Sequence, residues 1–183
     1  MSSGAIIPVE VVKSITGATD DAVATMQGNA IVQLIEGYLC VTLIKQDFQN
    51  ERITVPYKHS RVFKTKHCPI NSVSALNFIT ADATYQASQK QLMLGYHIVE
   101  VIGTLPVGVS AVKITYNAGL YDSWADVPAI IQLAAEELLK YKFNPNYMAG
   151  FNSEHLGDYS YSKGSIVRGL PAEIAGMLDG VEL

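Results

Sequence analysis

Two segments with helical periodicity enclose a long stretch with strand composition, and this order limits the folds open to the chain. In residues 21–44 and again in residues 127–142, apolar side chains recur at steps of three and four, the spacing of one helix face. Residues 52–118 between them are rich in Val, Ile, Thr, Tyr and Phe, which is typical of short strands. The order predicts an α+β protein: mainly a helical bundle with an inserted antiparallel β-hairpin or small sheet.

The first long helix is expected to follow a short one over residues 8–15, because Pro8 suits a first helical turn. Gly28 and Gly37 each cost the long helix about 1 kcal/mol relative to Ala, so we expect close packing at both. The apolar residues that recur along this helix are Val23, Met26, Ala30, Ile31, Leu34, Ile35, Tyr38 and Leu39.

The second long helix is expected to begin near Pro128. Its inner face is predicted to consist of Val127, Ile130, Ile131, Ala134, Leu138 and Tyr141. Among the strands, "GYHIVEVIG" (95–103) and "SAVKITYNAG" (110–119) alternate well and are separated by the turn-forming "TLPVG". This pattern predicts that the two segments pair antiparallel and that "NAG" ends the second one.

The segment "SEHLGDYSYSKGS" (153–165) contains one aliphatic residue and cannot build a core. A short helix is expected after Pro171, with Leu170, Ile174, Met177 and Leu178 on one face. Burying these four side chains contributes about 6–12 kcal/mol, and ordering ~9 residues costs about 1–2 kcal/mol each. The helix therefore needs a ready-made surface.

Two alternatives remain open for that surface. The C-terminal residues can fold back on their own domain, or they can act as a reaching arm whose aromatic side chains bind a partner. Composition alone favours neither. We expect a core domain over residues 1–150 and a C-terminal arm with its short helix over residues 151–183.

Composition and charge argue against several classes of function. The net charge is −4 and the Lys and Arg residues are scattered, whereas tight nucleic-acid binding needs clustered cations. Only "HSRVFKTKH" (59–67) is locally basic. This segment is interpreted either as a solvated strand or hairpin edge or as a phosphate contact. No apolar run approaches the ~20 residues of a membrane span, and no leader is apparent, so we expect synthesis in a cytoplasm and no membrane partner.

Motifs that carry chemistry are not apparent either. Ser160 and Lys163 have an S-x-x-K spacing but lie in a Gly-flanked polar stretch, and the four His residues are scattered. Cys40 and Cys68 make neither a disulfide framework nor a zinc site, and Cys40 is expected as a buried free thiol. We predict no enzyme activity, no catalytic residue, no cofactor and no metal.

Several segments, in order, resemble the head–tail connector (adaptor) proteins of tailed bacteriophages. They are "VEVVKSITGATDDAVATMQGNAIVQLIEGYL" (9–39), "PINSVSAL" (69–76), "VKITYNAG" (112–119) followed by "VPAIIQLAAEELLKYKF" (127–143), "LGDYSYS" (156–162) and "LPAEIAGML" (170–178). The resemblance spans nearly the whole chain, and the strand followed by the Val-Pro helix is its most specific part. The polar stretch 81–91 departs from the family pattern because it is expanded.

The resemblance implies a structural protein of the virion neck that forms a homo-oligomeric ring, a dodecamer in the family. Such a ring docks under the portal protein, offers a surface to a tail-side stopper or tail-completion protein, and leaves a channel for genomic DNA without sequence-specific binding. The residues carried over as portal-facing are Tyr159, Tyr161, Leu170, Ile174, Met177 and Leu178. Deleting residues 153–183 is then expected to spare the fold and abolish portal attachment.

Two other functions stay open from the sequence. One is another ring-forming phage neck or tail-completion protein, although such proteins are usually dominated by a β-barrel. The other is a small ligand-binding or hydrolytic α+β domain, which predicts a pocket with convergent polar groups. The mass of the purified protein and a screen for activity discriminate among them.

Overall fold

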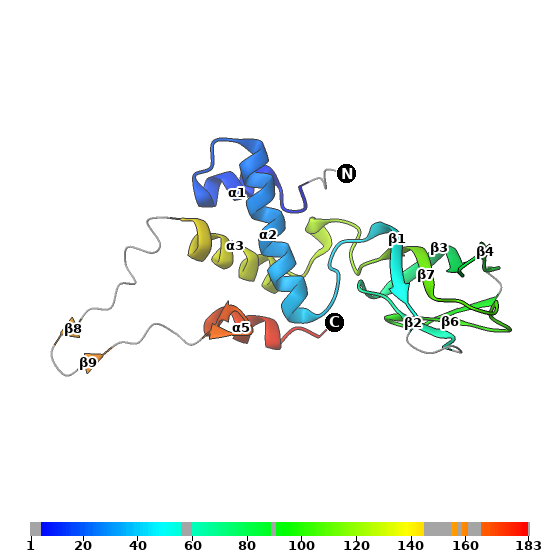
Figure 1. The fold of residues 1–183 in the computed structure, drawn as a ribbon. Helices are drawn as coiled ribbons and strands as arrows, with labels where there is room; N and C mark the ends of the chain where they lie inside the picture. Colours follow the sequence, from blue (N-terminus) through cyan, green and yellow to red (C-terminus); the bar gives the residue numbers. More distant parts are fainter. Residues whose placement is uncertain are drawn as a thin grey trace. The chain divides into compact units, whose positions relative to one another are not determined.

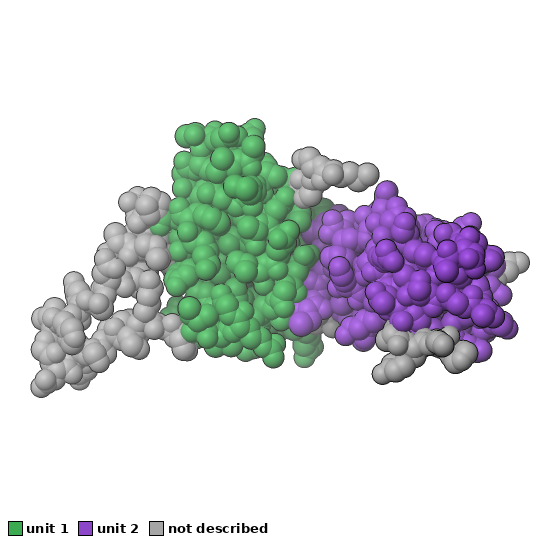
Figure 2. Space-filling view, in the orientation of Figure 1, with its two compact units in different colours: residues 1–39, 123–183 green, residues 40–122 purple. Residues whose placement is uncertain are grey.

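The chain forms two compact units in a computed structural model (Figures 1 and 2). Residues 1–39 and 123–183 make up the helical unit, and residues 40–122 make up the β unit. The structure describes residues 5–55, 60–88, 91–144, 155–156, 159–160 and 166–182. No helix in these ranges has the length and apolar character that a membrane crossing requires. The expected boundary at residue 150 lies outside the described residues.

The described residues of the helical unit contain four α-helices. They are α1 (Val9–Thr16), α2 (Asp21–Leu39), α3 (Ala129–Phe143) and α5 (Ala172–Asp179). Helices α1, α2 and α3 pack against one another, and α5 packs on α3. The predicted helices over residues 8–15 and 127–142, and the short helix after Pro171, are confirmed within two residues at each end.

A tight turn and a close helix contact join α1 to α2. Gly17 ends α1 with a left-handed φ of 74° and donates its N–H to the carbonyl oxygen of Lys13, whose ammonium forms an ion pair with Asp21. A Cβ at Gly28 would lie 3.1 Å from Cγ2 of Val12, so the predicted close packing at Gly28 is confirmed. At Gly37 the prediction is wrong, because a Cβ there would meet nothing within 4 Å.

Helix α2 ends at Leu39, five residues before the end that the sequence predicts. Cys40 adopts a left-handed φ of 57° and is exposed, so the expectation of a buried thiol is wrong. The next residues run on as a link whose Val41, Thr42 and Leu43 are buried. The run from Tyr38 to Ile44, apolar except for Thr42, fits a helix or a buried link equally well, and the backbone at Cys40 decides between them.

Local hydrogen bonds fix the start of α3, and a long-range hydrogen bond fixes its end. The 3-10 helix η2 (Trp124–Asp126) precedes it, and Ser123 donates its N–H and its hydroxyl to Asp126 Oδ2 at 3.1 and 2.7 Å. Gln132 Nε2 donates to the carbonyl oxygen of Val127 at 2.7 Å. At the other end, Asn144 Nδ2 donates to the carbonyl oxygen of Ile15 at 3.1 Å, which ties the end of α3 to α1.

The β unit contains a four-stranded and a three-stranded antiparallel sheet. The strands of the larger sheet, in spatial order, are β1 (Gln46–Thr54), β7 (Ala111–Ala118), β3 (Ile70–Ile79) and β4 (Thr84–Gln86). Those of the smaller sheet are β2 (Val62–Lys64), β6 (Ile98–Val101) and β5 (Leu92–Leu94). The structure describes no α-helix between residues 40 and 122 in the ranges given above.

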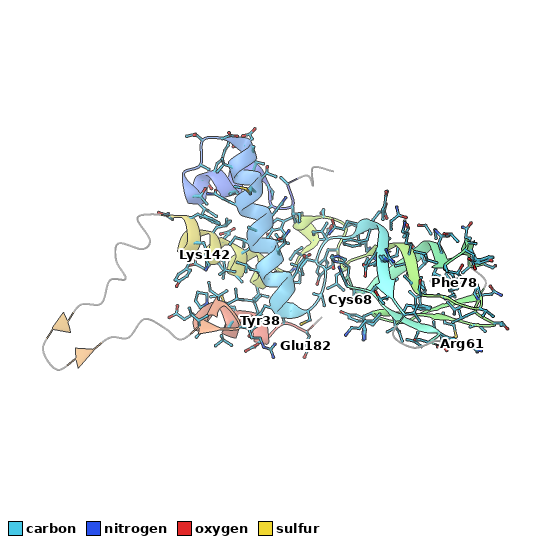
Figure 3. All side chains as sticks on the ribbon, in the orientation of Figure 1. Tyr38, Arg61, Cys68, Phe78, Lys142 and Glu182 are labelled. Carbon is cyan, nitrogen blue, oxygen red and sulfur yellow. The ribbon has the colours of Figure 1, made fainter. Side chains whose placement is uncertain are left out.

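Both sheets contribute to a single hydrophobic cluster, which is the core of the β unit. Its buried members include Leu76, Phe78, Val112, Ile114 and Tyr116 from the larger sheet, and Phe63, Val99 and Val101 from the smaller one. Figure 3 labels Phe78 among these strands. The prediction of a mainly helical bundle is therefore wrong. The region predicted as a small insertion has enough paired strands to enclose a core of its own.

The predicted pairing of residues 95–103 with 110–119 is also wrong. Strand β6 pairs with β2 and β5, whereas β7 lies between β1 and β3 in the other sheet. Alternation shows that each strand buries one face, but it does not select the partner. Residues 102–110 thus connect the two sheets instead of closing a hairpin.

Gly119 ends β7, as predicted from "NAG". Its φ is 133°, and a Cβ at this position would lie 2.6 Å from backbone atoms of Lys45. Only glycine tolerates both the backbone conformation and the close approach. The chain crossing at this point places Ile44 beside Tyr121 in an isolated bridge.

Candidate assembly interface

The structure places three of the six predicted partner-binding residues in the core of the helical unit. Leu170, Ile174 and Leu178 are 1%, 5% and 1% exposed, and Met177 is half-buried. Tyr159 belongs to β9 (Tyr159–Ser160), which pairs with β8 (His155–Leu156) in a small hairpin. Tyr161 lies outside the described residues.

Polar contacts add to this burial where α5 meets the end of α2. The hydroxyl of Tyr38 donates to Asp179 Oδ1 at 2.6 Å, and the hydrogen bond raises the pKa of that phenol. The guanidinium of Arg168 lies 5.8 Å from the centre of the Tyr38 ring, within the range of a cation–π contact. Figure 3 labels Tyr38 beside α5.

A two-residue turn prepares the chain for α5. Strands β10 (Ile166–Val167) and β11 (Leu170–Pro171) pair across Arg168 and Gly169, whose φ values are 48° and 86°. Positive φ at both central residues is the requirement of a type I′ hairpin turn. The hairpin leaves Ile166 exposed at 70% and directs Leu170 into the core.

The C-terminal residues 166–182 therefore pack on the helical unit of their own chain. The ready-made surface that the short helix needs is supplied by α3 and by the end of α2. The alternative in which all residues after 150 act as a reaching arm is wrong for residues 166–182.

The feature that sequence reasoning missed is a second apolar face on α2. The buried face contains Ala24, Gly28, Ile31, Val32, Ile35 and Tyr38. Val23, Met26, Ala30 and Leu34, which belong to the apolar residues that recur along the predicted helix, are exposed, Met26 by 66%. Their spacing places them on one side of the helix, and we call them the α2 stripe. Because α2 is apolar on two faces, its periodicity did not show which face is the inner one.

Helix α3 shows the same discrepancy near its first turns. Ile131, Ala134 and Leu138 are buried as predicted, but Ile130 is 40% exposed. Leu133 is 44% exposed on the same side. Exposed apolar residues on these two helices are candidates for contact with another chain.

The β unit contains a polar cluster around Tyr116. The phenol donates to Glu51 Oε2 at 2.5 Å and accepts the N–H of His67 at 3.3 Å. The other oxygen of Glu51 accepts the N–H of Lys66 at 3.0 Å. Burial, reinforced by the hydrogen bond to Glu51, raises the pKa of Tyr116.

The imidazole of His67 completes this cluster. It stacks on Phe48 with ring centres 3.6 Å apart, and its Nδ1 lies 3.4 Å from the hydroxyl of Thr42. Burial lowers the pKa of His67. In the described ranges no buried side-chain polar atom lacks a hydrogen bond, which is typical of a structural cluster.

The described residues contain no group of three or more His, Cys, Asp or Glu side chains placed to hold a metal ion. Cys68 donates its thiol to the carbonyl oxygen of Cys40 at 3.2 Å, and burial raises its pKa. A raised pKa disfavours the thiolate, which is the nucleophilic form. The exposed apolar faces of the helical unit are therefore the stronger candidates for function.

Comparisons with solved structures identify the class of protein in which this fold occurs. The chain is similar to a chain in the neck of an empty gene transfer agent (GTA) particle determined with C6 symmetry, with a TM-score of 0.64 and 17% identity over 98% of this chain and 90% of that chain. A chain in the virion of a native GTA particle matches with a TM-score of 0.60 and 19% identity, over 95% and 88%.

A third likeness is to a chain in the neck of a native GTA particle determined with C12 symmetry, with a TM-score of 0.55 and 17% identity over 97% and 93%. No protein-family model matches the chain, and no curated protein matches it at a significant level. At these identities the comparisons show the fold. Both units of this chain have counterparts, because nearly the whole of each chain is covered.

Proposed function

We propose that this chain is a structural protein of the neck of a tailed, phage-like virion, where copies of it form a ring. The observation that carries the proposal is the fold, which matches chains of GTA necks over 97–98% of this chain. Those necks were determined with C6 and C12 symmetry, which supports a ring of the same order, a dodecamer in the simplest case.

The α2 stripe is the surface that we assign to contact between copies. A ring needs a heterologous interface, in which one face of a subunit packs against a different face of the next. Val23, Met26 and Leu34 present large apolar side chains to solvent on a helix whose other face is already in a core. Packing against the next copy removes this surface from water.

The remaining roles follow from the resemblance to connector proteins. We assign portal docking to Tyr159, Tyr161 and Met177, and we assign to Leu170, Ile174 and Leu178 the role of anchoring that region on the helical unit. The far side of the ring would receive a tail-side stopper or tail-completion protein. DNA would pass through the channel without sequence-specific contacts, because the net charge of −4 gives no overall attraction for phosphates.

The test measures the mass of purified assemblies, with and without a portal protein, by native mass spectrometry. Met26→Asp places a charge in the α2 stripe, at a side chain whose 66% exposure spares the fold. We expect the wild type to form rings. In the variant, the association constant of the ring should fall about tenfold or more, since a buried unpaired charge is costly.

Val107→Asp is the matched control, because Val107 is 97% exposed and lies in the β unit. This variant also replaces an exposed apolar side chain with Asp, but outside the α2 stripe, and it is expected to leave the rings intact. Rings that persist in Met26→Asp would exclude the α2 stripe as the contact. A wild type that stays monomeric even with portal protein would contradict the ring itself.

A further inference from the structure

The solvent-facing side of the four-stranded sheet carries a row of polar residues that crosses all of its strands. In register order the row runs from Arg52 on β1 to Lys113 on β7, Asn77 on β3 and Gln86 on β4. Arg52, Lys113 and Gln86 are exposed, and Asn77 is half-buried. We call these four residues the cation row.

Two cations stand directly opposite each other in this row, an arrangement that a sheet normally avoids. Directly opposed residues on antiparallel strands have Cβ atoms about 4.5–5.5 Å apart, and like charges there repel. The ion pairs found among the described residues involve Lys13, Lys45 and Lys140, so neither Arg52 nor Lys113 takes part in one of them.

The acidic residues of β1 do not compensate the cation row. Glu51 lies next to Arg52 in the sequence but faces the core side, where it accepts the hydroxyl of Tyr116. Asp47 pairs in register with Asn117, whose side-chain amide donates to it at 2.9 Å. Asn117 is four residues from Lys113 along β7, roughly 13 Å.

Charge is also divided unequally between the two units. Residues 40–122 contain eight Lys or Arg and five Asp or Glu, a net charge of +3. Residues 1–39 and 123–183 contain five and twelve, a net charge of −7. Identical subunits of net charge −4 repel one another, unless their contacts bring a basic face against an acidic one.

We infer that the cation row is a docking surface for the acidic helical unit of a second copy of this chain. The inference rests on the proposed ring and adds a second, electrostatic contact to it. A heterologous interface makes this possible, because every copy presents its basic face to its neighbour's acidic face. The unfavourable opposition of Arg52 and Lys113 is relieved when carboxylates of the neighbour lie between them.

A nucleic acid is the weaker occupant for this surface. Two cations neutralise few phosphates. The cation row also contains no aromatic side chain on which a base could stack. DNA binding is therefore an outcome that the experiment must be able to detect.

The experiment uses the full chain with Lys113→Glu, which turns the opposed cations into an ion pair. We expect the melting temperature to stay the same or rise, because repulsion within the sheet is replaced by attraction. We also expect the association constant of the ring to fall about tenfold at low salt, since the new carboxylate meets the neighbour's carboxylates. Lys64→Glu, an exposed change of the same charge in the other sheet, is the control and should affect the ring little.

A carbodiimide cross-link between Lys113 and a carboxylate identifies the neighbour directly. In rings assembled from a mixture of isotopically labelled and unlabelled chains, we expect mixed-label cross-links from Lys113 to residues 1–39 or 123–183. Rings of unchanged stability in Lys113→Glu, or cross-links confined to one chain, would overturn the inference and leave the proposed function intact. A mobility-shift assay with duplex DNA tests the other occupant: if the wild-type ring binds DNA and Lys113→Glu loses that binding with its ring intact, the surface belongs to nucleic acid instead. Failure of the wild type to assemble would contradict both proposals.

Discussion

Single residues set the conformation of this chain at points where the sequence pattern is ambiguous. The left-handed φ of Cys40 ends α2 within a run that is apolar except for Thr42. A Cβ at position 119 would lie 2.6 Å from backbone atoms of Lys45, so Gly119 permits a close approach that other residues would block. Arg168 and Gly169 turn the chain so that Leu170 enters the core. Periodicity averages over many residues, so it does not detect such points.

The pH dependence of stability at the residue scale depends on His67. Its pKa is lower in the folded chain than in the unfolded chain, because burial disfavours the imidazolium. The unfolded state therefore binds more protons near this pKa, and stability rises with pH. We expect the contribution to be complete above about pH 6.5 and to be lost as the pH falls below that value.

Urea unfolding between pH 5 and 7.5 measures this effect. His67→Phe is the matched variant, since it can retain the stack on Phe48 but cannot titrate. The wild type should lose more stability than the variant on acidification. Equal slopes for the two proteins would show that His67 does not supply the pH dependence.

At the scale of elements, helix starts were predictable from the sequence and strand partners were not. Pro8, Pro128 and Pro171 stand directly before α1, α3 and α5, because proline is compatible with a helix start and its signal is local. Strand β7 pairs with β1 and β3, both distant in sequence. Their partnership depends on the tertiary fold, which a single-sequence pattern does not encode.

The candidate interface was predictable only in part, because the side of α2 that is buried also depends on the tertiary fold. The sequence pattern identified Val23, Met26 and Leu34 among the recurring apolar residues of α2, and these three are exposed. It did not include Val32, which is fully buried. The face with small residues, including Ala24 and Gly28, is the one that packs inside. A helix that is apolar on two sides carries a signal for a second interface, although the signal does not distinguish the two sides.

The burial of α5 makes a prediction at this scale. Leu178→Ala should lower the free energy of unfolding by about 2–4 kcal/mol, because it creates a cavity in a packed core. Leu178 is 1% exposed. Ile166→Ala, at a side chain that is 70% exposed, should change the free energy by no more than about 0.5 kcal/mol. Chemical denaturation compares the two variants, and equal effects would mean that α5 is not held on its own chain.

At the scale of the whole molecule, the fold, the exposed apolar surface of α2 and the charge distribution all suit assembly with other copies. The fold is similar to that of chains from the necks of GTA particles. In the proposed ring, the exposed α2 stripe would be the apolar contact with a neighbour, and the opposite net charges of the two units would favour an electrostatic one. Each feature suits a subunit whose two sides meet different faces of its neighbours.

The central claim is that copies of this chain close into a ring. Electron microscopy of the purified wild-type protein, alone and mixed with portal protein, tests it most directly by averaging single particles in projection. The account predicts closed rings with a central opening and a rotational symmetry compatible with the C6 and C12 order of the similar necks. Particles of monomer or two-fold dimer size under every condition, with portal protein present, would contradict it.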